Sequence, residues 1–90
     1  MPSTIEVDLI SDTGTRPTAA MRQAMASAEV GDEQAGEDPT VNKLLEMACE
    51  LTGHEAAVYV PSGTMCNAIA YRLYCRQGDG VILDELAHPI

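Results

Sequence analysis

The sequence predicts an α/β fold made of an extended arm, two helices and one strand–helix–strand (βαβ) unit. Within 54–90 a β-prone run, a helical stretch and a second β-prone run follow one another, which is the order of a βαβ unit in a parallel sheet. Two segments of 17–53 repeat apolar residues at helical spacing, whereas 1–16 has no helical period. We therefore divide the chain into an N-terminal arm (1–16), helices with an acidic loop (17–53) and the start of an α/β domain (54–90).

The arm is rich in Thr, Ser, Asp and Gly, and its apolar residues alternate. Ile5, Val7 and Leu9 would share one face of an extended chain. We expect this face to pack on another surface.

The first helix is predicted to follow Pro17 and Thr18, with Met21 and Met25 at helical spacing. Proline suits the first turn of a helix because its missing N–H is not needed there.

An acidic loop bracketed by glycines, 31–38, precedes the second helix. Asp38 can cap this helix, Pro39 fits its first turn and Gly53 ends it. Its apolar residues fall on one face: Val41, Leu44, Leu45, Ala48 and Leu51.

In the βαβ unit, 55–60 and 81–83 are the expected strands and 64–76 is the expected helix, stopped by Gly78. A parallel sheet of two strands has uncovered edges and an unfinished core. We therefore expect the protein to continue beyond Ile90.

Composition excludes several function classes. The formal charge of −9, from fourteen acidic and five basic residues, argues against nucleic-acid binding. No stretch approaches the roughly 20 apolar residues of a membrane span. The cysteines, Cys49, Cys66 and Cys75, form neither an even set nor a CxxC pair, which predicts reduced thiols in a cytoplasmic protein. Histidines and acids lack metal-ligand spacing, so no metal is expected.

The turn from Ser62 to Met65 joins a predicted strand to a helix, where unpaired N–H groups and the helix dipole suit a phosphate. Gly63 lets the backbone approach an anion, and the hydroxyls of Ser62 and Thr64 can donate to it. The alternative is that Ser62 or Thr64 only caps the helix.

His88 follows the second predicted strand, at the carboxyl end of the sheet, where α/β proteins bind ligands. His88 and the turn at 62–64 should therefore open toward one crevice. A surface or hydrogen-bonding role for His88 is the alternative, and His54 is interpreted as structural.

Five short motifs, in order and at matching intervals, resemble the front part of the low-specificity threonine aldolases. They are DLISDT (8–13), TRPT (15–18), GEDPTVN (36–42), PSGTM (61–65) and AH (87–88). The resemblance implies the aminotransferase-like fold (fold type I), with pyridoxal 5'-phosphate bound in a homodimer or homotetramer. It implies cleavage of a small β-hydroxy amino acid, of the threonine or allo-threonine type, to glycine and an aldehyde.

The resemblance also assigns roles to residues. Gly63 and Thr64, with the backbone of Met65, would hold the cofactor phosphate. His88 would stack on the cofactor ring and is the candidate catalytic base, and Ser11 would contact the substrate carboxylate.

Two positions depart from the family pattern, which usually has Arg at the place of Ile10 and an aromatic residue at that of Ala35. Another pyridoxal-dependent lyase or a racemase therefore stays open, as does a non-catalytic module that binds a phosphorylated ligand or a protein. The sole lysine, Lys43, is interpreted as a solvated helix residue. The Schiff-base lysine, which the 90-residue chain alone lacks, is then expected beyond Ile90.

Overall fold

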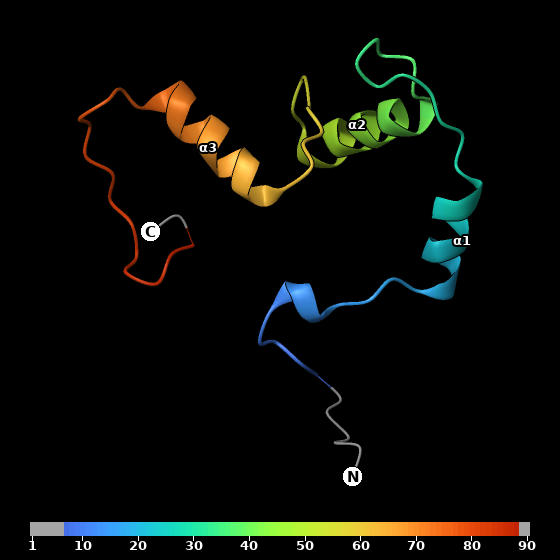
Figure 1. Cartoon of the computed structure of the whole chain (residues 1–90), viewed down its shortest axis with the longest axis horizontal. Helices are drawn as coiled ribbons and strands as arrows, with labels where there is room; N and C mark the ends of the chain where they lie inside the picture. Colours follow the sequence, from blue (N-terminus) through green and yellow to red (C-terminus); the bar gives the residue numbers. More distant parts are fainter. Residues whose placement is uncertain (1–6, 89–90) are drawn as a thin grey trace. The chain divides into compact units, whose positions relative to one another are not determined.

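A computed structural model describes residues 7–88 of the chain. In this range there is one 3₁₀ turn, η1 (Asp12–Gly14), and three α-helices: α1 (Ala19–Ser27), α2 (Pro39–Thr52) and α3 (Gly63–Tyr74) (Figure 1). The chain divides into two compact units, residues 1–40 and residues 41–90, and each is described by itself.

The described part of the arm is not fully extended, because η1 interrupts it. The Oγ of Ser11 accepts a hydrogen bond from the N–H of Thr13 at 3.2 Å and lies 2.8 Å from the Oγ1 of Thr13. Thr15 Oγ1 donates to the carbonyl of Asp12 at 2.7 Å. The predicted extended arm is therefore wrong at 12–14, where local Ser and Thr bonds favour a turn. Ile5 lies outside the described residues.

The first helix, α1, begins where the sequence indicates but uses its proline differently. Thr18 is the N-cap, and its Oγ1 accepts from the N–H of Met21 at 3.1 Å. Pro17 precedes this cap instead of sitting in the first turn. At the other end, Ser27 Oγ donates to the carbonyl of Gln23 at 2.7 Å.

The acidic loop of the first unit is held by hydrogen bonds within it and between the residues that flank it. Oδ1 of Asp32 accepts from the N–H of Gln34 at 3.0 Å, and Thr40 Oγ1 donates to the carbonyl of Glu29 at 2.6 Å. Gly36 has φ +73°, a conformation that favours glycine. A Cβ on Gly31 would overlap the backbone carbonyl of Glu37, so the loop also needs glycine at that position.

Both ends of α2 confirm the sequence prediction. Oδ1 of Asp38 accepts from the N–H of Thr40 at 3.0 Å, as a capping residue does. Gly53 follows the helix with φ +72°, and its N–H donates to the carbonyl of Cys49 at 2.9 Å.

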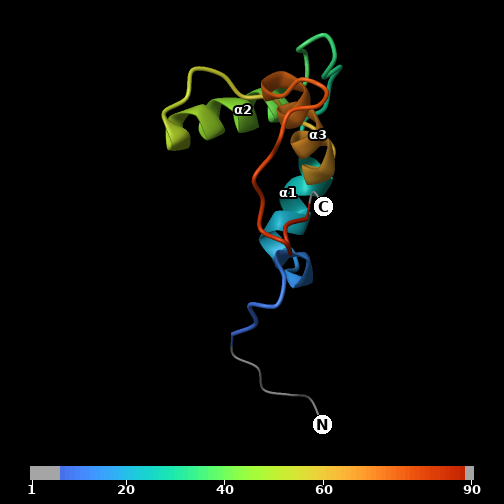
Figure 2. The same cartoon turned by 90° about the vertical axis from the view of Figure 1, so that its left-hand side faces the viewer.

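The end of α3 corrects the prediction that this helix runs to Arg76 and is stopped by Gly78. It ends at Tyr74, and Cys75 is already extended. The carboxylate of Asp79 accepts from the N–H of Arg76 at 2.7 Å, which draws this N–H out of the helical pattern. Gly78, with φ +94°, belongs to the separate turn that follows. Figure 2 shows that residues 75–88, which follow α3, form no helix or strand.

Neither predicted strand, 55–60 or 81–83, is a strand among residues 7–88, so the described residues show only the helix of the expected βαβ unit. A strand needs a hydrogen-bonded neighbour, and neither run has one in this range. The first run nevertheless lies beside the predicted helix: Val58 and Val60 line an apolar hollow of about 200 Å³ with Ile69 and Leu73 of α3.

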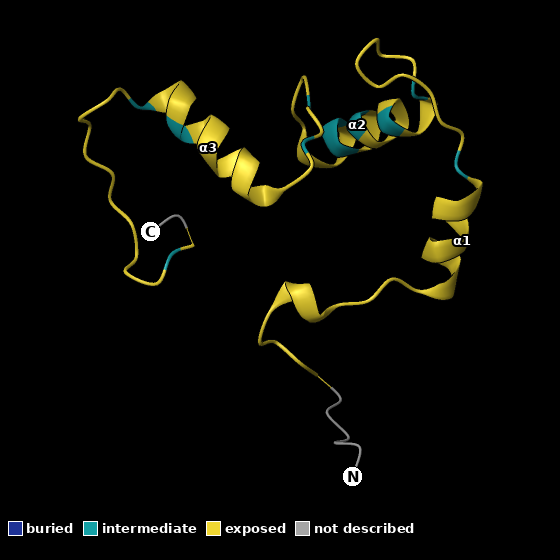
Figure 3. Cartoon of the chain, in the orientation of Figure 1, coloured by how far each residue is buried: buried dark blue, intermediate teal, exposed yellow. Residues whose placement is uncertain are grey.

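No residue in the described range 7–88 is fully buried (Figure 3). The largest group of half-buried positions lies on α2, where they are Val41, Leu45, Ala48 and Cys49. Ile82 is 101% exposed, whereas its neighbours Val81 and Leu83 are 46% and 42% exposed, so one face of the second β-prone run has no protein cover in this range. None of the helices in this part of the chain is long and apolar enough to cross a membrane.

Candidate functional site

The first turn of α3 is built by Ser62, which is the N-cap of the helix. Its backbone is extended, with φ −151° and ψ 152°, and its Oγ accepts from the N–H of Met65 at 3.2 Å. The carbonyl of Ser62 accepts from the N–H of Cys66, also at 3.2 Å. Capping by Ser62 is therefore observed. Accepting a bond uses only a lone pair, so the same hydroxyl can still donate to an anion.

Gly63 and Thr64 supply the two backbone donors that precede the helical hydrogen bonds. Within residues 7–88 neither N–H donates to a protein acceptor, as expected at a helix start. A Cβ built on Gly63 meets nothing within 4 Å, so the backbone is uncovered on the side where a side chain would stand. Two unpaired N–H groups, a hydroxyl on each side of Gly63 and the positive end of the helix dipole suit a phosphate group.

The structure brings two predicted site residues together, although they are distant in sequence. Thr64 and His88 line one hollow of about 270 Å³, whose other lining residues are Asn67, Ala68 and Tyr71 of α3. Both Thr64 and His88 are exposed. The segment that follows α3 thus returns to the same helix and carries His88 to the face on which Thr64 lies.

Ser11 belongs to the first unit, residues 1–40. Its hydroxyl is engaged with Thr13 in η1, and its side chain is exposed. The described geometry of Ser11 is that of a capping residue of a short turn.

Sequence reasoning missed Asn67 and Tyr71 as residues of the hollow. Both lie on the stripe of α3 that begins at Thr64, three and seven residues further on. That spacing places side chains on one side of a helix, so the stripe was the available signal.

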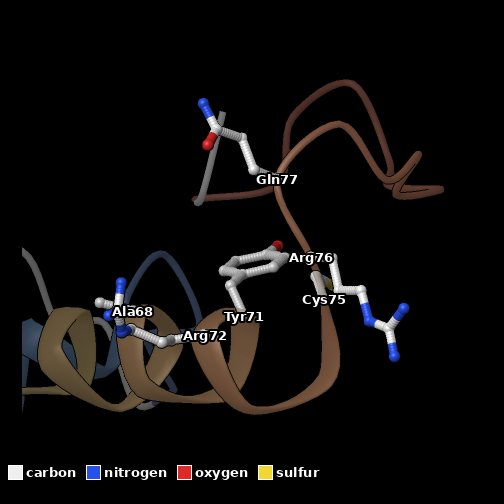
Figure 4. A pocket seen from close by; sticks show the side chains of 6 residues that line it. All are labelled: Ala68, Tyr71, Arg72, Cys75, Arg76 and Gln77. Atoms are coloured by element: carbon white, nitrogen blue, oxygen red, sulfur yellow. The ribbon is translucent and has the colours of Figure 1, made fainter.

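A larger hollow, of about 660 Å³, lies at the other end of α3 and contains none of the predicted site residues (Figure 4). It is lined in part by Arg72, Arg76 and Gln77. Tyr71 lines both hollows, and in Figure 4 its hydroxyl end lies on the side of Cys75. Thr64 and His88, which the sequence predicts as site residues, therefore line the smaller hollow and not this larger one.

Two other sequence interpretations concern residues away from the hollow. Lys43 is exposed on α2, in agreement with its interpretation as a solvated helix residue. Among residues 7–88, no group of three or more His, Cys, Asp or Glu side chains could hold a metal ion.

Comparison with known proteins defines the class. Residues 8–90 match the family model described as Beta-eliminating lyase, and the chain belongs to this family. The family is pyridoxal phosphate dependent and has the fold type I architecture. The residues at the start of α3 fit the phosphate of that cofactor, since the N–H groups of Gly63 and Thr64 have no protein acceptor within residues 7–88.

Similar proteins carry a more specific description. The chain is 49% identical over 82 residues to the low specificity L-threonine aldolase of Escherichia coli (strain K12), with 91% of this chain and 25% of the relative covered. It is 51% identical over 89 residues to a probable low-specificity L-threonine aldolase 2 of Arabidopsis thaliana, and the match covers 97% of this chain and 25% of that relative. The chain is 52% identical over 83 residues to the low-specificity L-threonine aldolase 1 of that plant, and the match covers 91% of this chain and 23% of that relative. The chain spans about a quarter of the length of these relatives. No solved structure gives a significant match.

Proposed function

We propose that the chain is the N-terminal part of a pyridoxal-phosphate-dependent aldolase that cleaves a small β-hydroxy amino acid to glycine and an aldehyde. The observation that carries this proposal is the shared hollow of Thr64 and His88, beside the unpaired N–H groups at the start of α3. The sequence identity of 49–52% to threonine aldolases supports this class of reaction.

The start of α3 holds the cofactor phosphate in this proposal. The N–H groups of Gly63 and Thr64 and the hydroxyls of Ser62 and Thr64 are its donors. The backbone of Met65 contributes least to binding the phosphate, because its N–H already donates to the Oγ of Ser62. The bound cofactor supplies an electron sink for the bond that breaks.

His88 has two roles in the proposal. Its flat imidazole lies against the cofactor ring, and one ring nitrogen takes the proton of the substrate β-hydroxyl. The exposure of His88 on the hollow supports both roles, because the side chain can meet a ligand there. Ser11 contacts the substrate carboxylate through its hydroxyl, which can donate while still accepting from Thr13.

The finer architecture belongs to the same proposal. In the whole protein, 55–60 and 81–83 pair with neighbouring strands, so that 54–90 becomes the first βαβ unit of the large domain. The arm (1–16) and the helical segment (17–53) pack against this domain or a second subunit. The uncovered apolar side chains of the arm, Leu9 and Ile10, each 90% exposed, support burial in a homodimer or homotetramer.

We place the protein in the cytoplasm, because an odd number of cysteines without a CxxC pair is typical of a reducing compartment.

A different lyase reaction is the second candidate, and the description of the family as Beta-eliminating lyase favours it. The aromatic residue that Ala35 replaces would lie in the acidic loop, where its loss can change which substrates fit.

Products decide between the two reactions. The full-length protein, purified with its visible cofactor absorbance, is given L-threonine and L-allo-threonine. Aldol cleavage yields glycine and acetaldehyde, whereas elimination yields ammonia and a keto acid. Elimination products alone would replace the aldolase proposal with the second candidate, and a protein without the cofactor absorbance would contradict both.

A further inference from the structure

Asn67 and Tyr71 are the polar residues of the hollow that have no role in the proposed function. Asn67 lies one helical turn beyond Thr64 on α3, and the two side chains share the hollow with His88. Neither the carboxamide of Asn67 nor the imidazole of His88 makes a hydrogen bond to protein within residues 7–88. Two side chains with unused hydrogen-bonding capacity therefore line the same hollow.

The other lining residues leave few alternatives for the imidazole. Ala68 has no polar side-chain atom, and Thr64 is assigned to the phosphate. Tyr71 is half-buried, and its hydroxyl end lies toward Cys75 in Figure 4, away from the start of the helix. Asn67 is the remaining side chain that can bond to the histidine from α3.

A base needs a definite arrangement of its two nitrogens. The nitrogen that accepts the substrate proton must be unprotonated, so the other nitrogen must carry hydrogen and find an acceptor. The carboxamide oxygen of Asn67 is such an acceptor. Once cofactor, substrate and the rest of the protein exclude water from the hollow, an unmade hydrogen bond at either group becomes costly.

We propose that Asn67 is a positioning residue, whose carboxamide oxygen accepts a hydrogen bond from one ring N–H of His88 and fixes the tautomer and orientation of the imidazole. This inference rests on the proposed function, in which His88 is the base. The hydrogen bond itself, however, can be tested without turnover.

Two substitutions separate hydrogen bonding from packing. Asn67→Leu keeps a similar volume and favours the helix, but it removes the acceptor. Asn67→Asp keeps an acceptor oxygen at the same place. Gln23→Leu is the matched control, since it removes an exposed carboxamide from α1, outside the hollow. Assays use saturating cofactor, because a carboxylate one turn from the phosphate donors weakens anion binding.

In the full-length protein, Asn67→Leu should retain bound cofactor and lose roughly 10²-fold in turnover, the scale of a small misplacement of a catalytic group. Asn67→Asp should restore most of that turnover, and Gln23→Leu should change little. Equal loss in the Leu and Asp variants, or no loss in either, would overturn the positioning role.

A spectroscopic measurement distinguishes a failure of this inference from a failure of the proposed function. Nitrogen NMR of His88, assigned through His88→Phe, should show one neutral tautomer in the wild type and in Asn67→Asp, and a mixture in Asn67→Leu. A tautomer ratio that is unchanged in Asn67→Leu refutes the hydrogen bond even in an active enzyme. If the wild-type protein holds no cofactor, the proposed function fails, while the tautomer ratio still decides whether Asn67 orients His88.

Discussion

The carboxylate of Asp38 binds the backbone of Gly31 across the acidic loop: Oδ2 accepts from the N–H of Gly31 at 3.2 Å. The other oxygen of this carboxylate caps α2 through Thr40. One side chain therefore closes the loop and starts the helix. The geometry of the loop and the position of the first turn of α2 are coupled through Asp38.

Removing this carboxylate should destabilise the full-length protein. Asp38→Ala loses both bonds, and the loss of an N-cap alone costs about 0.5–2 kcal/mol. Asp38→Asn retains one acceptor oxygen and should give an intermediate value. Urea unfolding of the wild type and both variants measures the difference, and an Ala variant as stable as the wild type would contradict the dual role.

Gly31 should tolerate no side chain. A Cβ at this position would overlap the carbonyl of Glu37, which is backbone and cannot rotate away. We expect Gly31→Ala to lower the free energy of unfolding by about 1–3 kcal/mol, as overpacking does. Gly80→Ala is the control, because a Cβ at Gly80 meets nothing within 4 Å. Equal stability of the two variants would show that the loop shifts without cost.

Thr64→Val should weaken cofactor binding while leaving the helix intact. The substitution removes one of the hydroxyls that hold the phosphate in the proposed function, and a hydrogen bond to a charged group is worth about 1.5–3 kcal/mol. A loss of that size corresponds to an affinity roughly tenfold lower or more. Titration of the apoenzyme with cofactor measures it. Thr52→Val, which removes a hydroxyl that donates to the carbonyl of Ala48, should leave the dissociation constant unchanged.

His88→Phe separates stacking from proton transfer. Phenylalanine keeps a flat ring but has no nitrogen, so the variant should retain cofactor and lose roughly 10²–10⁴-fold in turnover. Visible absorbance gives the occupancy, and the rate of aldehyde release gives the turnover. Near-normal turnover at full occupancy would exclude His88 as the base, and normal turnover in His88→Ala as well would remove it from the site.

The helix ends show what the sequence can and cannot predict. Thr18, Asp38 and Gly53 act through bonds to residues a few positions away, so their roles follow from local sequence. The sequence prediction missed the end of α3 at Tyr74, because it placed the helix end only by the next glycine. In the structure the carboxylate of Asp79 accepts the hydrogen bond from the N–H of Arg76 instead of a helical carbonyl. The runs 55–60 and 81–83 depend on pairing with distant chain, which no local pattern contains.

The candidate site divides in the same way. The capping bond of Ser62 and the free donors after it follow from the start of a helix. The approach of His88 to Thr64 was expected from the topology of a βαβ unit, and they share a hollow although the strands are not formed. Asn67 was missed because an asparagine inside a helix is most simply a surface residue.

The hollow also constrains how the length of this protein can vary. Thr64, Asn67 and Tyr71 share one side of α3, and each added residue turns an α-helix by about 100°. A single inserted residue between them would rotate Tyr71 away from the hollow that it shares with His88. The same insertion would move Leu73 out of the apolar hollow that it lines with Val58 and Val60. An insertion after Tyr74 would leave the α3 side of both hollows intact and alter only the reach of the segment that carries His88. Among natural relatives, length differences should therefore be absent from 64–71 and rare but tolerable near the turn at 76–79.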